Sequence, residues 1–117
     1  GIDTMIAQAV YLGAHGGVAG GANLFPRVYV RMFEGAKAGN HEEVRKMQAA
    51  IVALQAVYRE DAGHSTGVGS YLKGVKYGLQ VLGICSDAMS WPFQPLSKQA
   101  KTGIERIIRQ VAELSGE

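Results

Sequence analysis

The sequence has one cysteine, Cys85, and few residues arranged for metal binding. A single cysteine excludes a disulfide framework within the chain and a cysteine-rich metal site. His41 and His64 stand near predicted helix starts, with no acid or thiol at the spacing of metal ligands. We therefore expect no metal site and no cofactor.

Long apolar runs and clusters of basic residues are also missing. No run reaches the roughly 18 residues that a membrane span requires, and no secretory signal peptide is visible. Basic residues alternate with acidic or apolar ones, so the net charge of +2 forms no stripe for a phosphate backbone. We expect a cytoplasmic protein with neither nucleic-acid nor membrane partners.

Apolar residues at helical spacing dominate what is present. With 47% hydrophobic and 19% charged residues, the composition fits one globular domain. Capping residues and periodicity predict helices over about 3–12, 26–38, 40–58, 66–82 and 97–115. Asp3 is the expected N-cap of the first helix. The expected inward residues of the later helices include Tyr29, Met32, Phe33, Ala36, Val44, Met47, Ile51, Leu54, Tyr58, Leu72, Val75, Leu79, Leu82, Ile104, Ile107, Ile108, Val111 and Leu114.

The stretch HGGVAGG, residues 15–21, interrupts this helical pattern. Each glycine costs roughly 1 kcal/mol within a helix, so the stretch between two helices is predicted to be a short buried strand. A single strand would leave backbone groups unpaired at both edges. The sequence therefore predicts a strand near residues 16–21 whose partner strands lie outside the chain.

These glycines are open to three interpretations. A phosphate-binding loop is disfavoured, because neither the dinucleotide fingerprint nor a Walker loop is present. Close packing of a strand against a neighbour is a second interpretation. The third is a pocket wall, since the carboxyl ends of the strands form the active-site face of a (β/α)8 barrel.

The order of several motifs resembles one enzyme family. GIDTMIAQAVYLGAHGGVAGGANLFP, YLKGVKYGLQVLGI and WPFQPLS are similar to the C-terminal part of the dihydrodipicolinate synthase/N-acetylneuraminate lyase family. The resemblance implies an α/β fold, with residues 1–39 as the last βα units of a (β/α)8 TIM barrel and 40–117 as a C-terminal helical extension. It also implies a class I aldolase or lyase that forms a Schiff base with pyruvate or another 2-keto acid.

The same resemblance places part of a substrate pocket in this chain. Gly1, Asp3, Val18 and Gly20 match pocket-wall positions, Asp3 being one that binds substrate hydroxyls in sialic-acid lyases. Thr4 and Gly20 depart from the Glu and Ser of those lyases, which argues against a sialic-acid substrate. The catalytic lysine is expected upstream of this chain, and the complete enzyme is expected to be a homotetramer.

The lysines of this chain and two of its tyrosines are not assigned to catalysis. Surface positions are predicted for the lysines of the helices and caps: Lys37, Lys73, Lys76, Lys98 and Lys101. Tyr71 and Tyr77 are predicted to lie at the barrel mouth, at an interface or in the core. Two alternatives remain open, a stand-alone helical interaction module and a barrel homologue without catalytic activity.

Overall fold

Capping residues set most helix boundaries in the computed structural model, which describes all of residues 1–117. Asn40, Thr66 and Ser97 each accept a hydrogen bond from the backbone N–H three residues further on. Gly39 and Gly116 end their helices in the left-handed conformation. In chain order the elements are η1 (Asp3–Met5), α1 (Ile6–Tyr11), η2 (Gly20–Asn23), α2 (Pro26–Ala38), α3 (His41–Leu54), η3 (Gln55–Tyr58), α4 (Gly67–Val81) and α5 (Lys98–Ser115), where η denotes a 3-10 helix.

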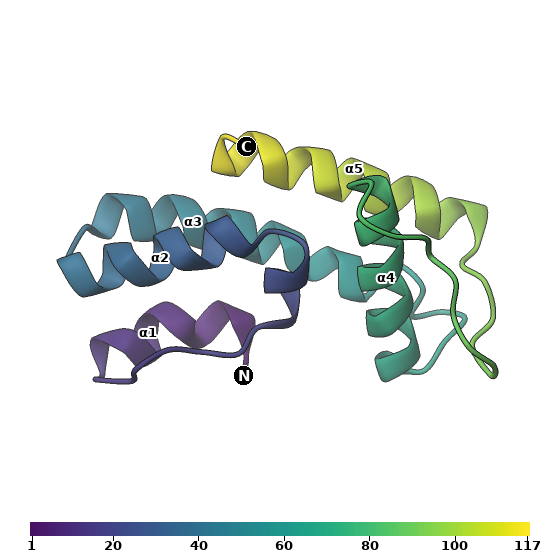
Figure 1. The fold of residues 1–117 in the computed structure, drawn as a ribbon, viewed down its shortest axis with the longest axis horizontal. Coiled ribbons are helices and arrows are strands. Elements are labelled where there is room, and N and C mark those ends of the chain that lie inside the picture. Colours follow the sequence, from purple (N-terminus) through teal and green to yellow (C-terminus); the bar gives the residue numbers. More distant parts are fainter.

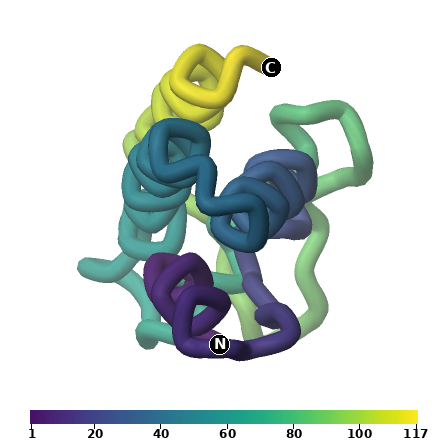
Figure 2. Tube along the Cα trace, turned by 90° about the vertical axis from the view of Figure 1, so that its left-hand side faces the viewer, coloured from purple at the N-terminus to yellow at the C-terminus, as the bar shows by residue number.

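The helices form an elongated arrangement of 43 × 25 × 23 Å. α2 and α3 are an antiparallel pair, and α5 packs along α3 (Figure 1). α1 lies against α2, and α4 runs across the other helices where it contacts η3 and α5. Viewed from one end, α2, α3 and α5 lie side by side, with α1 close to α2 and α3 (Figure 2). None of these helices combines the length and the apolar character needed to span a bilayer.

One hydrophobic core joins α1, α2, α3, η3, α5 and, through Tyr77, α4, and it confirms most of the predicted inward residues of α2, α3 and α5. Its members without any exposed surface are Val28, Met32, Met47, Ala50, Ile51, Leu54, Val57, Ile104 and Val111. Burial of such side chains contributes about 1.5–3 kcal/mol each. This core therefore fixes the relative positions of the N-terminal segment and the C-terminal helices.

The predicted inward face of α4 is wrong in part. Leu72 and Leu82 are each 36% exposed. α4 instead turns its small residues toward η3: a Cβ at Gly74 would overlap the carbonyl oxygen of Val57. Close approach of two backbones excludes bulky side chains from this contact, and neither Leu72 nor Leu82 is buried by it.

The strand predicted near residues 16–21 is not formed in this chain. Residues 14–19 have no regular secondary structure, although Ala19 has extended backbone angles (φ −114°, ψ 133°). Gly20 begins the 3-10 helix η2. A strand is defined by its hydrogen bonds to neighbouring strands, and these 117 residues supply no neighbour.

Candidate substrate-pocket wall

The carboxylate of Asp3 joins three separate parts of the chain. Asp3 is only 6% exposed, and its Oδ2 accepts hydrogen bonds from the backbone N–H of Gly21 (3.0 Å), from Tyr29 (2.7 Å) and from Tyr58 (2.9 Å). These donors come from η2, α2 and η3. The predicted role of Asp3 as an N-cap is wrong, because Ile2 holds that position and no side chain caps η1. The carboxylate makes tertiary contacts instead.

The Asp3 carboxylate is an anion surrounded by neutral hydrogen-bond donors. Burial raises the pKa of Asp3, but hydrogen bonds from Tyr29, Gly21 and Tyr58 outweigh it, so the pKa lies below its ordinary value. Burial and the Asp3 hydrogen bond both raise the pKa of Tyr29 and of Tyr58. At neutral pH, Asp3 is therefore ionised while both phenols remain protonated.

Gly20 lies directly beside this carboxylate and beneath a third tyrosine. The backbone of Gly20 precedes the Gly21 N–H that donates to Asp3 Oδ2, and it contributes to the low pKa of Asp3. A Cβ at Gly20 would overlap the hydroxyl of Tyr71 and would lie 2.9 Å from its Cζ. The aromatic rings of Tyr58 and Tyr71 are in contact, with centroids 4.8 Å apart and an angle of 59° between their planes. The tyrosine from α4 thus fills the space that a side chain at Gly20 would take.

The other two predicted pocket residues lie next to each other. A Cβ at Gly1 would be 3.0 Å from the carbonyl oxygen of Val18, so the two backbones approach closely. The side chain of Val18 is 87% exposed. The structure therefore brings the four predicted residues into two neighbouring pairs, Gly1 with Val18 and Asp3 with Gly20.

Sequence reasoning missed the role of two tyrosines. The helical pattern predicts Tyr29 and Tyr58 only as inward residues of helices, yet their hydroxyl groups donate hydrogen bonds to Asp3. Both positions fit an apolar helix face, and a buried tyrosine normally needs a partner for its hydroxyl. That requirement was the available signal, but it did not identify Asp3 as the acceptor.

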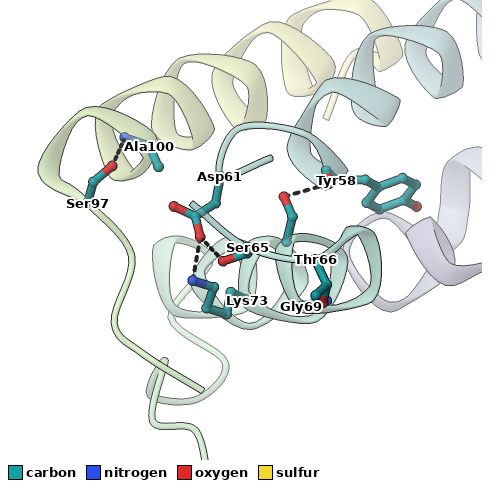
Figure 3. Close-up of polar contacts among 9 residues, drawn as sticks. Tyr58, Asp61, Ser65, Thr66, Gly69, Lys73, Ser97 and Ala100 are labelled. Carbon is teal, nitrogen blue, oxygen red and sulfur yellow. Dashed lines mark hydrogen bonds and ion pairs between the residues drawn. The ribbon is translucent and has the colours of Figure 1, made fainter. Parts of the chain in front are cut away.

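Lys73 contradicts the prediction that the lysines lie on the surface. It is 5% exposed and forms an ion pair with Asp61, which is 2% exposed, and Ser65 also donates to this carboxylate (Figure 3). Burial raises the pKa of Asp61, but the hydrogen bonds from Lys73 and Ser65 outweigh it and lower the pKa. A second contact attaches α4 to η3: the Ser70 hydroxyl donates a hydrogen bond of 2.9 Å to the Tyr58 carbonyl oxygen.

Neither the Asp3 carboxylate nor the Asp61–Lys73 ion pair has the ligands of a metal site. No group of three or more His, Cys, Asp or Glu side chains lies in position to hold a metal ion. The groups around Asp3 are hydroxyl and amide donors, and the partner of Asp61 is an ammonium group. Both carboxylates therefore already accept hydrogen bonds from groups of this chain, Asp3 through its Oδ2 alone.

The sequence of this chain matches the model of a protein family over nearly its whole length. Residues 1–111 match the dihydrodipicolinate synthetase family. The chain belongs to this family.

Individual dihydrodipicolinate synthetase relatives align with the chain over part of their own length. The chain is 30% identical to 4-hydroxy-tetrahydrodipicolinate synthase from Jannaschia sp. over 112 residues, which cover 93% of the chain and 36% of that enzyme. It is 25% identical to the enzyme of the same name from Leptothrix cholodnii, over 97% of the chain and 36% of the relative. The chain therefore spans about a third of these relatives.

The fold of the chain is similar to a solved structure from the same family. Dihydrodipicolinate synthase from Bacteroides thetaiotaomicron is 38% identical to the chain and superimposes with a TM-score of 0.82, over 93% of the chain and 36% of that structure. The helical arrangement is therefore that of the corresponding part of a dihydrodipicolinate synthase, and a C-terminal fragment fits these matches.

Proposed function

We propose that the complete protein is a Schiff-base-forming lyase or aldolase acting on pyruvate or another 2-keto acid. The match of residues 1–111 to the dihydrodipicolinate synthetase family carries this proposal. The relatives named 4-hydroxy-tetrahydrodipicolinate synthase support a lyase of this kind. In the proposed first step, a lysine amine adds to the ketone carbon of the 2-keto acid and water leaves, giving an imine.

The catalytic lysine is proposed to lie outside residues 1–117. A lysine that forms an imine must reach its substrate as a free amine. Lys73 is the most buried lysine position that the chain offers, and it is held by Asp61. Lys101 is paired with Asp87 at 2.9 Å. These pairings support a lysine elsewhere in the protein.

The residues of this chain are proposed to form one wall of the substrate pocket. Gly1 and Val18 would present backbone to the substrate, and Gly20, at the carboxyl end of the eighth barrel strand, would make room for the Tyr71 hydroxyl. Asp3 would bind a substrate hydroxyl through Oδ1, because its Oδ2 already accepts three hydrogen bonds. In this arrangement Asp3 would bind the substrate as a negative charge and would not act as a general base.

The larger organisation follows from the same proposal. Residues 1–39 would complete the barrel, residues 40–117 would form the helical extension, and the extended segment 14–19 would pair with strands from the rest of the protein. We further propose a cytoplasmic homotetramer with no nucleic-acid or membrane partner.

Borohydride trapping on the full-length protein tests the proposal. Incubation with pyruvate and then sodium borohydride should reduce the imine to a stable secondary amine, detected by mass spectrometry. Peptide mapping should place the adduct on a lysine outside residues 1–117. An adduct on Lys73 or another lysine of this chain would refute the upstream position. No adduct at all would favour a non-catalytic barrel homologue.

A further inference from the structure

Tyr71 is the one tyrosine whose hydroxyl group makes no hydrogen bond within the chain. The chain has five tyrosines. The hydroxyls of the other four contact His41, Asp3 or Glu105, at distances between 2.6 and 3.0 Å; these tyrosines are Tyr11, Tyr29, Tyr58 and Tyr77. Tyrosine is amphipathic and its hydroxyl usually finds a partner. The hydroxyl of Tyr71 is therefore available to a group that the chain does not supply.

The position of this hydroxyl is fixed at the proposed pocket wall. It occupies the space over Gly20 where a side chain would begin. Gly20 lies at the carboxyl end of the extended segment 14–19, next to the Asp3 carboxylate. A hydroxyl group thus lies at the position of a residue-20 side chain, although it belongs to Tyr71 of α4.

Three contacts hold the Tyr71 ring in place. Its ring packs on Tyr58, whose own hydroxyl is held by Asp3. The preceding residue, Ser70, donates a hydrogen bond of 2.9 Å to the Tyr58 carbonyl. One turn further on, Gly74 brings α4 into backbone contact with η3. A group held in this way loses little conformational entropy when it binds a ligand.

We propose that Tyr71 is a specificity-determining residue that hydrogen-bonds a hydroxyl of the aldehyde partner, or of the corresponding part of the substrate in the cleavage direction. This inference rests on the proposed function. A phenol hydroxyl both donates and accepts, so it pairs well with an alcohol. The adjacent Asp3 anion makes the wall polar, which favours a hydroxylated substrate over an apolar one. The 2-keto acid end, bound at the lysine, does not use Tyr71.

Substrate discrimination by the full-length enzyme tests this role. The two aldehyde probes, each combined with pyruvate, are glyceraldehyde and propanal, which share a three-carbon chain and differ in hydroxyl groups. Tyr71→Phe keeps the ring on Tyr58 but removes the hydroxyl. We expect kcat/KM for glyceraldehyde to fall roughly tenfold in this variant, the size of one lost hydrogen bond, and kcat/KM for propanal to stay unchanged.

Tyr77→Phe is the matched control, because Tyr77 lies on the same helix but donates to Glu105 on α5. It should leave the ratio of the two kcat/KM values unchanged. Equal losses for both aldehydes in Tyr71→Phe, or no loss for either, would overturn the inference while pyruvate trapping keeps the proposed function. Failure of the wild-type enzyme to trap pyruvate would overturn both.

Discussion

Replacing Lys73 by methionine should loosen α4 more than any other single lysine substitution in the chain. Lys73 and Asp61 are 5% and 2% exposed, so water cannot replace the lost ammonium group. Removal of one partner of a buried ion pair costs about 3–5 kcal/mol, because the other charge stays buried. Ser65 still donates to Asp61, which places the expected cost at about 3 kcal/mol, the lower end of that range.

Hydrogen exchange of the α4 backbone amides in the full-length protein measures this effect locally. A loss of about 3 kcal/mol corresponds to exchange roughly 100-fold faster. Lys76→Met on the same helix is the control, since Lys76 forms no ion pair and should change stability by less than about 0.5 kcal/mol. The double variant Lys73→Met/Asp61→Asn should recover much of the loss, because no charge is left unpaired.

Two results would refute this reasoning. Equal exchange rates in Lys73→Met and Lys76→Met would show that the ion pair does not hold α4. A double variant as unstable as the sum of its single variants would show that Lys73 and Asp61 act independently.

The ion pair of Asp61 and Lys73 also predicts acid sensitivity. The folded pKa of Asp61 lies below the ordinary 3.8, so the contribution of Asp61 to the stability of the fold is complete above about pH 4. This contribution is lost as the pH falls through the folded pKa.

Three further predictions concern other parts of the chain. Gly39→Ala should lower the melting temperature through a cost of about 1 kcal/mol, because Gly39 has φ 70°, and should leave turnover unchanged; an unaltered melting curve would contradict this. Asp3→Asn should destabilise the protein by about 1–3 kcal/mol in denaturant titrations, and a neutral effect would mean that its three donors have other partners. Tyr77 should ionise at a pH of about 12, since Glu105 and burial raise its pKa, and ultraviolet titration should show a lower pKa in Glu105→Gln.

Helix boundaries could be predicted because they depend on neighbouring residues. Asn40 accepts a hydrogen bond from the Glu43 backbone N–H at 3.1 Å, and Gly39 has the left-handed backbone that its position after α2 requires. Asn40 and Glu43 have the spacing of a capping box, but only the hydrogen bond to the Asn40 side chain is present. The Glu43 side chain forms an ion pair with Arg31 at 2.6 Å instead, a partner from another helix that local spacing does not reveal.

The buried face of α4 could not be predicted from periodicity. Leucines at helical spacing favoured one face, but the close backbone approach at Gly74 selects another. That choice depends on η3, which precedes α4 by a loop of irregular structure. The same loop supplies Asp61, and without it Lys73 is indistinguishable from a surface lysine. The helical pattern alone therefore does not determine which face of α4 is buried, because that face is selected by contacts with η3 and the loop.

The sequence proposed residues for the candidate site, but it did not reveal the contacts that those residues make. The resemblance identified Asp3 and Gly20, which lie together in the structure. Tyr58 is 55 residues from Asp3 in the chain, and no spacing rule links them. The strand predicted near residues 16–21 was wrong for this chain because its stability depends on strands elsewhere in the protein.

The three donors of Asp3 have a consequence for recombining members of this family. A crossover near Gly39, between α2 and α3, is simple to join because both helices have their own caps. It would nevertheless take Asp3 and Tyr29 from one parent and Tyr58 from the other. A chimera whose second parent has no hydroxyl at residue 58 would leave the carboxylate short of a donor. Chimeric enzymes should therefore inherit these three residues as a unit, even where that moves the crossover into a less convenient segment.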